Sequence, residues 1–306
     1  MIRRVLVIKL AALGDFVQAF GPFATIRAAH PQAEITLLTT RPYAGLATAS
    51  PWFDHVHVDD KPKIWQLAKV ARLKNWLRCG RFDRVYDLQT SDRSNWYFRL
   101  MGGDVEWSGI AKGCSHPHAN PRRDFMHTLD RQAEQLAMAG LSPMVAPDLG
   151  WAGADVSRFG LPRPYALICP GGAAHRPGKR WTVPGFSAVA LWLAQAGVTP
   201  VLIGAESEQA EIGAILAACP SARSLAGQTS FADILGLAVQ ARLAVGNDTG
   251  PMHLIAATGC PGLALFGPES DPALCGPRGR IEIVTAADLG RLEAGVVMSR
   301  LAGMVA

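Results

Sequence analysis

Short apolar runs alternate with helix-compatible stretches along the whole chain, and this alternation restricts the fold more than any other feature. In the first half, strands are expected at residues 5–8, 35–39, 55–58, 84–88 and 105–108, with helices after residues 15, 42, 64, 93 and 127. In the second half, strands are expected at residues 165–169, 200–203, 223–226, 243–245, 262–266 and 281–284, with helices at 184–195, 208–218, 231–240 and 251–258. Such an order predicts parallel sheets covered by helices, the α/β class.

The length of 306 residues suits two domains of about 150 residues each. Residues 141–164 are rich in Pro, Gly and Asp and end where a new strand is expected, which predicts an interdomain linker. We therefore expect an N-terminal domain at residues 1–155 and a C-terminal domain at residues 156–306. Two doubly wound domains facing one another would bind ligands at the carboxyl ends of their strands.

Composition favours a cytoplasmic globular protein. The chain is 49% hydrophobic and 18% charged, and no run approaches the ~20 apolar residues that span a membrane. The basic start followed by an apolar run resembles a signal peptide, but Lys9 interrupts the run, so residues 4–8 are expected to form a buried strand. The six cysteines show no spacing typical of a metal site and are expected to be core residues in a reducing compartment.

The first motif lies between the first expected strand and helix. Gly14 allows a tight turn, and Asp15 stands where a helix N-cap is expected. Asp15 would either project a carboxylate as a base for an acceptor hydroxyl or simply cap the helix, with Lys9 as a solvated strand end. The loop has no GxGxxG pattern, which argues against a dehydrogenase.

The second motif follows the first expected strand of the second half. Gly171 and Gly172 let backbone N–H groups approach an anion, while Lys179 and Arg180 supply positive charge. This composition favours phosphate binding. The alternative is a basic surface loop in which Trp181 is a packing anchor.

The third motif spans residues 246–253. Asp248 or Thr249 is expected to cap a helix that starts near Pro251, leaving N–H groups at a positive helix end that suits a pyrophosphate. The alternative is an ordinary helix cap. His253 by itself is more typical of a packed histidine than of a catalytic one.

Taken together, the motifs resemble the lipopolysaccharide heptosyltransferases of glycosyltransferase family 9. The resemblance runs from the N-terminus to about residue 275 and rests on Lys9 with Leu13-Gly14-Asp15, Asp87-Leu88-Gln89, Pro170-Gly171-Gly172 with Lys179-Arg180-Trp181, Gly204-Ala205-Glu206-Ser207-Glu208, Asn247 through His253, and Phe266-Gly267-Pro268. The resemblance implies a GT-B type fold of two facing Rossmann-like domains. It also implies metal-independent, inverting transfer of heptose from ADP-heptose.

The resemblance also implies residue roles. Asp15 would be the catalytic base, Lys179 would contact the donor phosphates during catalysis, and Glu208 would contact the ribose. The implied donor-binding residues are Gly171, Gly172, Lys179, Arg180, Glu208, Asp248, Thr249, Gly250 and His253. Residues Ala173 and Ala174 replace hydroxyl residues found in some relatives, so backbone N–H groups or His175 would substitute for those phosphate contacts.

The interpretation of a basic segment, residues 61–82, depends least on the family resemblance. It holds seven basic residues and no acidic one. Apolar residues 64, 67, 68 and 71 recur at helical spacing, which predicts an amphipathic helix packed on the N-terminal domain. Its cations either face solvent or meet an anionic acceptor at the cytoplasmic face of the inner membrane. Its two tryptophans are too few and too far apart for nucleic-acid stacking.

The resemblance therefore implies heptosyl transfer to a lipopolysaccharide core or lipid A acceptor, and we expect no cofactor, no metal and no nucleic-acid partner. The residues assigned to acceptor binding are Lys9, Gln89, Lys69, Arg72 and Lys74. The alternatives are a sugar-nucleotide epimerase of the same architecture and a non-catalytic nucleotide-sugar-binding protein. A nicotinamide oxidoreductase is a more distant possibility.

Overall fold

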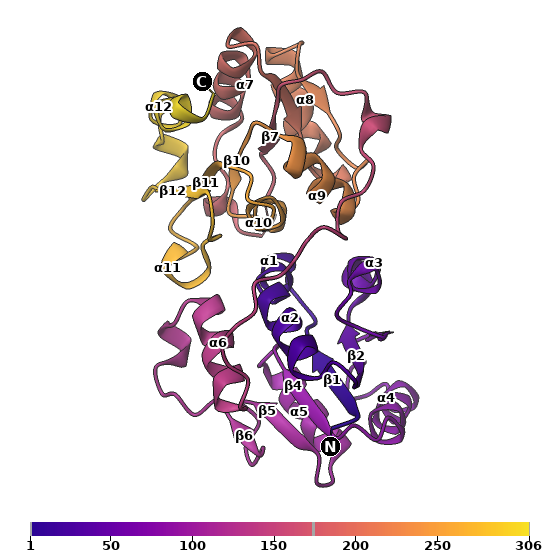
Figure 1. Ribbon diagram of the computed structural model, residues 1–306. Coiled ribbons are helices and arrows are strands. Elements are labelled where there is room, and N and C mark those ends of the chain that lie inside the picture. Colours follow the sequence, from indigo (N-terminus) through magenta and orange to yellow (C-terminus); the bar gives the residue numbers. More distant parts are fainter. Residues whose placement is uncertain (1, 173–174, 306) are drawn as a thin grey trace. The chain divides into compact units, whose positions relative to one another are not determined.

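The computed structural model describes residues 2–172 and 175–305 (Figure 1). The chain divides into two compact units, residues 1–151 and 152–306. This division falls four residues before the boundary expected after residue 155. Each unit contains one sheet of parallel strands, so the expected α/β class is confirmed.

The N-terminal unit has six strands in the order β3-β2-β1-β4-β5-β6. The strands are β1 (Arg4–Ile8), β2 (Glu34–Thr39), β3 (His55–Val58), β4 (Arg84–Asp87), β5 (Glu106–Gly109) and β6 (His116–Pro117). The α-helices are α1 (Leu13–Val17), α2 (Phe20–Ala29), α3 (Arg41–Ala49), α4 (Leu67–Cys79), α5 (Asp92–Met101) and α6 (Thr128–Met138). A short 3-10 helix, η1, spans Arg123–Phe125.

The C-terminal unit repeats this plan with the strand order β12-β11-β10-β7-β8-β9. Its strands are β7 (Tyr165–Cys169), β8 (Thr199–Leu202), β9 (Arg223–Ser224), β10 (Leu243–Asn247), β11 (Gly262–Phe266) and β12 (Ile281–Thr285). Its α-helices are α7 (Val183–Gln195), α8 (Gln209–Ala218), α9 (Phe231–Gln240), α10 (Gly250–Ala257), α11 (Pro272–Cys275) and α12 (Ala294–Val305). The 3-10 helices are η2 (Ser157–Phe159), η3 (Pro177–Lys179), η4 (Glu206–Glu208) and η5 (Leu289–Arg291).

Both sheets have the Rossmann order, in which the first strand lies between the second and the fourth. The chain runs outward in one direction from β1 and then in the other from β4, and likewise from β7 and β10. The loops after two such strands diverge and leave a crevice at their carboxyl ends. Each unit therefore has a switch point, β1 with β4 in one and β7 with β10 in the other.

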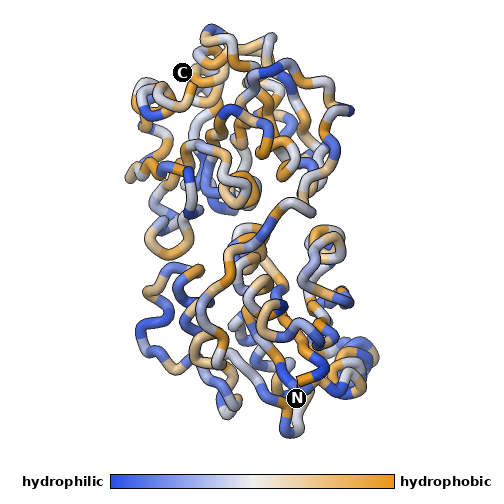
Figure 2. The backbone as a smooth tube through the Cα atoms, viewed as in Figure 1, coloured by the Kyte–Doolittle hydropathy of each residue, from blue (hydrophilic) through white to orange (hydrophobic). Residues whose placement is uncertain are grey.

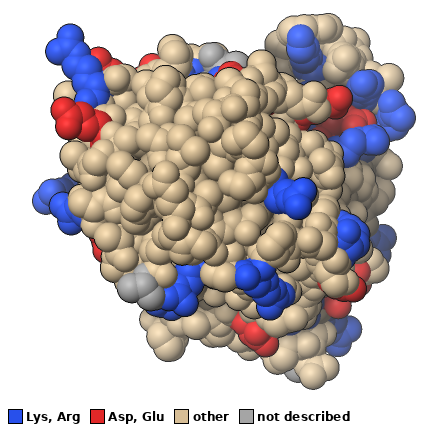
Figure 3. Space-filling view, turned by 90° about the horizontal axis from the view of Figure 1, so that it is seen from above, with Lys and Arg blue, Asp and Glu red and all other residues tan. Residues whose placement is uncertain are grey.

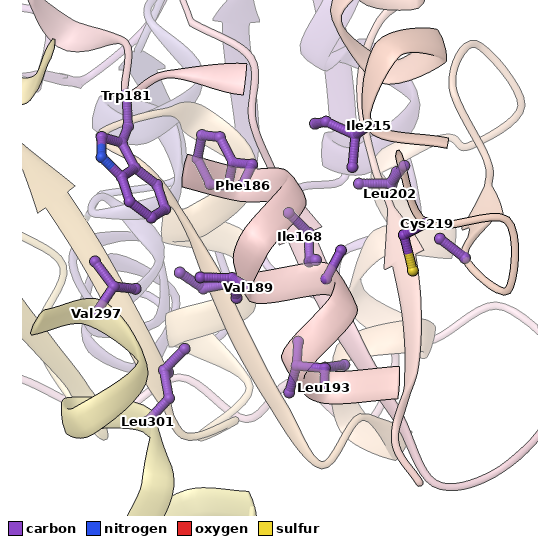
Figure 4. Close-up of a cluster of buried hydrophobic side chains, with 14 of the residues drawn as sticks. Ile168, Trp181, Phe186, Val189, Leu193, Leu202, Ile215, Cys219, Val297 and Leu301 are labelled. Carbon is purple, nitrogen blue, oxygen red and sulfur yellow. The ribbon is translucent and has the colours of Figure 1, made fainter. Parts of the chain in front are cut away.

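Hydrophobic burial explains why these strands form. In β1 every residue from Val5 to Ile8 is fully buried, as expected for a central parallel strand covered on both faces. Figure 2 shows hydrophobic and hydrophilic stretches alternating along both units. In the C-terminal unit, Val189 and Leu193 of α7 pack between residues of α12 on one side and Leu202 and Ile215 on the other (Figure 4).

Most strands lie within one or two residues of their expected positions. Among the strands and α-helices of the described residues, β6, α11 and α12 were not expected. The two-residue strand β6 contains a proline, which makes it unrecognisable from β propensity. In α12, Val297 and Leu301 are four residues apart and fully buried, which places this helix in the core.

The surface gives two further observations. On the face drawn in Figure 3, Lys and Arg side chains lie mainly around the margin of a broad uncharged area. Within the described part of the chain, no helix combines the length and apolar character that crossing a bilayer requires.

Candidate functional site

The expected donor-binding residues lie on the loops and helix starts that follow β7, β8 and β10, which are neighbours in the C-terminal sheet. We call this group of loops the C-terminal site. Because parallel strands end at the same edge of a sheet, residues far apart in sequence meet here. The structure brings Lys179 to Asp248 and Gly172 to Glu208.

Asp248 is the centre of the polar contacts in the C-terminal site. Its carboxylate accepts hydrogen bonds of 2.6 Å from both Lys179 Nζ and Ser270 Oγ. His253 Nε2 lies 3.7 Å from its other oxygen. Burial alone would raise the pKa of Asp248, but the hydrogen bonds from His253, Lys179 and Ser270 outweigh it and hold the pKa well below its ordinary value. The carboxylate thus stays charged and fixes the lysine ammonium in place.

Thr249 is the N-cap residue of α10, with an extended backbone. Its side chain does not hydrogen-bond to the helix, contrary to the expected capping role, and Asp248 does not cap the helix either. The Thr249 hydroxyl oxygen is buried and makes no hydrogen bond within the described residues. A buried hydroxyl without a partner is costly, and here it stands at the positive end of an eight-residue helix. This combination suits an anionic ligand.

The glycine loop after β7 is held by Glu208. Its carboxylate accepts hydrogen bonds from Gly172 N at 2.9 Å and Ala205 N at 2.8 Å. A Cβ atom on Gly171 would lie 1.9 Å from Glu208 Oε1, so a larger residue there would displace the Glu208 carboxylate from this position. Glu208 therefore links the β7 and β8 loops, in addition to any contact with a ribose.

Arg180 extends the same group of loops. Its guanidinium pairs with Glu211 at 3.0 Å and donates to the Gly172 carbonyl. Part of its charge is thus balanced within the protein. Residues 173–174, where the expected departure from the family falls, lie outside the described residues.

Asn247 is a structural residue of this site that sequence reasoning did not assign. Its side chain is fully buried, donates to the carbonyls of Pro170 at 2.7 Å and Gly171 at 3.0 Å, and accepts from Trp181 N at 2.9 Å. It thereby fixes the glycine loop and the start of the segment before α7. The only available signal was an amide residue ending an apolar run.

In the N-terminal unit, Asp15 is the third residue of α1 rather than its N-cap, which is Ala12. The Asp15 carboxylate accepts a 3.2 Å hydrogen bond from Ala12 N, as an acidic residue does in the first turn of a helix. The N-cap assignment was therefore wrong by three residues, because the tight turn comes earlier than Gly14. The side chain remains partly exposed.

The Gln89 side chain holds the backbone of the loop that leads to Asp15. Its side-chain oxygen accepts hydrogen bonds from Leu10 N at 2.7 Å and Ala11 N at 3.1 Å. Thr40 Oγ1 donates to the Leu10 carbonyl at 2.7 Å. The loop that carries Asp15 is therefore held by side chains from the β4 and β2 ends.

Lys9 and Asp87 are buried beneath this loop. The expectation of a solvated Lys9 was wrong, because its side chain is 4% exposed and Nζ donates to the Leu88 carbonyl at 2.9 Å. Burial lowers the pKa of Lys9, against the opposing charges of Asp15 and Asp87. Burial also raises the pKa of Asp87 to about 6, although Gln89 N and Thr90 N donate to it.

The remaining expected acceptor-binding residues, Lys69, Arg72 and Lys74, are exposed on α4. Lys69 and Arg72 line a cavity of about 360 Å³ whose other charged walls are Asp59 and Asp60. Trp76 also lines it and stacks on His57, with ring centroids 3.8 Å apart. Across the described residues, no three His, Cys, Asp or Glu side chains gather in an arrangement that could hold a metal ion.

Comparison with known proteins matches residues 70–293 to glycosyltransferase family 9 (heptosyltransferase). Lipopolysaccharide heptosyltransferase 2 of Salmonella typhimurium is 26% identical over 291 residues, which cover 87% of this chain and 83% of that protein. The structure of E. coli ADP-heptose lps heptosyltransferase II has a TM-score of 0.83 and 23% identity, covering 99% of this chain and 98% of that one. E. coli heptosyltransferase WaaC with ADP has a TM-score of 0.79 and 21% identity, covering 98% of this chain and 99% of that one. The likeness confirms the expected GT-B fold class.

Proposed function

The chain belongs to glycosyltransferase family 9, and from this premise we propose that it transfers heptose from ADP-heptose to a lipopolysaccharide core or lipid A acceptor. The observation that carries the donor assignment is the unpartnered Thr249 hydroxyl at the start of α10, beside the Lys179–Asp248 ion pair. A diphosphate is an anion of the size and charge that such a helix end accommodates. The relative WaaC is described with ADP, which agrees with an adenine nucleotide.

The donor's diphosphate would lie against the first turn of α10 and accept a hydrogen bond from Thr249. Lys179, held in place by Asp248, would oppose its charge, and Gly171 and Gly172 would bring the glycine loop close. Negative charge grows on the diphosphate as the glycosidic bond breaks. Lys179, Arg180 and the helix end stabilise that charge most strongly in the transition state.

Asp15 would supply the base. It accepts the proton of an acceptor hydroxyl while the hydroxyl oxygen forms a bond to the anomeric carbon, on the face opposite the nucleotide. The bond from that carbon to the diphosphate oxygen breaks, and its electron pair leaves with ADP. A single displacement of this kind inverts the anomeric configuration. The hydrogen bonds from the loop backbone to Gln89 would limit the movement of the loop that leads to the Asp15 carboxylate.

The acceptor would be recognised by positive charge. Lys69, Arg72 and Lys74 are exposed, so they could meet phosphates of a lipid-borne sugar core at the cytoplasmic face of the inner membrane. Lys9 and Gln89 would contribute to acceptor binding mainly by holding the loop that leads to Asp15. Reversing the three α4 cations to Glu should raise the acceptor KM and leave donor affinity unchanged.

A screen of ADP-sugars and UDP-sugars for nucleotide release tests this function. Release that requires a lipopolysaccharide core acceptor and is strongest with ADP-heptose supports it. Conversion of the sugar nucleotide without any acceptor would identify an epimerase, and tight donor binding without turnover would identify a binding protein. Turnover should also survive EDTA, and activity that EDTA removes and Mg²⁺ restores would contradict the metal-free mechanism.

A further inference from the structure

Three large apolar side chains, close together in the sequence, are exposed in the turn before α4 and at its first residue. Ile64, Trp65 and Leu67 leave 70%, 69% and 75% of their surface accessible. We call these three residues the apolar turn. The periodicity in the sequence had predicted that Ile64 and Leu67 pack against the domain, and this was wrong. Adjacent exposure of this kind signals an interaction surface, whereas single exposed apolar residues do not.

The helix α4 carries two apolar faces. Leu73 and Leu77 are buried and, with half-buried Val70, form the stripe that packs on the domain. Leu67, Ala68 and Ala71 are exposed. At about 100° per residue, these three fall within one sector of about 100°, and its nearest edge, at Leu67, lies about 60° from Val70 of the packed stripe.

Positive charge surrounds the exposed sector. By the same helical geometry, Arg72 lies on one side of it and Lys74 on the other, and both are exposed. Lys63 places its ammonium 5.0 Å from the centre of the Trp65 ring. Residues 61–82 contain no acidic residue. An exposed apolar sector that follows a Trp-containing turn and is bordered by Lys and Arg is typical of segments that lie in an anionic membrane interface.

The neighbouring carboxylates do not cancel this charge. Asp59 is 5% exposed and accepts a hydrogen bond from the Tyr97 hydroxyl. Asp60 and Asp83 are exposed and lie at the two ends of the segment. The segment's seven basic residues outnumber these two acids, so the balance of charge is positive.

The apolar turn is held by hydrogen bonds on both sides. Lys61 N donates to Asp59 Oδ1 at 2.8 Å, and Arg93 donates to the Pro62 carbonyl at 3.2 Å. The Gln66 side chain accepts from Lys63 N at 3.0 Å. The three apolar side chains are therefore presented on an ordered turn, which lowers the entropy lost when they are buried.

We propose that the apolar turn inserts shallowly into an anionic lipid bilayer, with the cations of α4 at the headgroups. This inference rests on the proposed function in one respect only: binding to the bilayer would bring the enzyme to its lipid-borne acceptor. Electrostatic attraction from each Lys or Arg adds to the apolar burial, and neither alone gives lasting attachment.

Sedimentation with vesicles of phosphatidylethanolamine and phosphatidylglycerol, without donor or acceptor, tests the proposal. The variant Ile64→Ser/Trp65→Ser/Leu67→Ser should bind at least about tenfold more weakly than the wild type. The matched control Val239→Ser/Val296→Ser also removes exposed apolar side chains, from the C-terminal unit, and should bind normally. Circular dichroism checks that each variant is folded.

A second measurement uses brominated lipids, which quench tryptophans that enter the bilayer. In the wild type, the part of the fluorescence that comes from Trp65 should be quenched. The Trp65→Phe variant keeps an apolar ring, so it should still sediment with the vesicles but should show no such quenching. Undiminished binding by the triple Ser variant overturns the proposal. So does wild-type binding that needs lipopolysaccharide in the vesicle, because the partner is then the acceptor and not the bilayer. Because donor and acceptor are absent, failure here is independent of transferase activity.

Discussion

Two buried ionic arrangements distinguish the two units at the residue scale. In the C-terminal unit, Asp248 is held charged by Lys179, Ser270 and His253. In the N-terminal unit, Asp87 is fully buried and one of its oxygens has no partner among the described residues, so its proton is held more tightly. The first arrangement fixes the Lys179 ammonium in the position where the proposed donor diphosphate would lie. The second places a carboxyl whose ionisation is unfavourable beneath the loop of Asp15.

Replacing Asp15 by Asn should lower turnover by about 10²–10⁴-fold with little change in donor affinity, because the base is lost. The Asn side-chain oxygen can still accept the hydrogen bond from Ala12 N, so the loop should keep its conformation. Steady-state kinetics and calorimetry of nucleotide binding measure the two effects. Near-normal turnover would reduce Asp15 to a residue that stabilises the helix.

Replacing Thr249 by Val removes the hydroxyl and keeps the side-chain shape. Since that hydroxyl makes no hydrogen bond within the described residues, stability should be unchanged or slightly higher. Nucleotide affinity should fall by about 5–10-fold, the equivalent of one hydrogen bond. Thr249→Ser should retain the affinity. A Val variant that binds ADP as tightly as the wild type would remove the hydroxyl from the donor site.

At the scale of elements, strand positions were predictable because buried parallel strands leave continuous apolar runs such as residues 5–8 and 243–245. The site motifs were placed at one sheet edge for the same reason. The packed face of α4 was not predictable, because the helix has two apolar stripes and periodicity alone does not say which one meets the sheet. The role of Asn247 depends on contacts 66 to 77 residues away, which no local pattern contains.

Helix α12 gives a stability prediction at this scale. Leu301 is fully buried in the C-terminal core, so Leu301→Ala should destabilise that unit by about 2–5 kcal/mol. Val296 lies on the same helix and is 44% exposed, so Val296→Ala should change stability by less than about 0.5 kcal/mol. Hydrogen exchange of peptides from β10 and β11 reports on the C-terminal unit directly. Equal effects of the two substitutions would mean that α12 does not complete this core.

For the whole molecule, two Rossmann-like units of similar size carry different kinds of residues at the same topological position. The loop after β7 is rich in glycine and basic residues. The loop after β1 instead leads to the Asp15 carboxylate, and the Gln89 side-chain oxygen holds the backbone of that loop. A doubly wound sheet offers the same crevice in each case, and the side chains at the strand ends decide the chemistry. The fold therefore predicts where ligands would bind, and the side chains at the strand ends predict which ligand each unit would receive.

Acid dependence of stability follows from Asp87. Its pKa is 3.8 in an exposed carboxyl and about 6 in the folded protein, so the folded state binds the proton more tightly than the unfolded chain. This group therefore favours folding most below about pH 4, and its contribution falls as the pH rises toward about 6. A difference of about two pKa units corresponds to about 3 kcal/mol.

The substitution Asp87→Asn should remove this slope, so that the variant gains stability over the wild type as the pH rises from about 4 to 6 and keeps the gain above it. Asn can still accept from Gln89 N and Thr90 N, and Asp15 continues to oppose the charge of Lys9. Urea unfolding across this pH range measures the effect on the free energy of unfolding. Protease cleavage within β1 and β4 reports how much of the N-terminal unit is unfolded at each urea concentration. Asp104→Asn, at an exposed position of the same unit, is the control and should leave the slope unchanged. Parallel curves for Asp87→Asn and the wild type would show that the buried carboxyl does not titrate on unfolding.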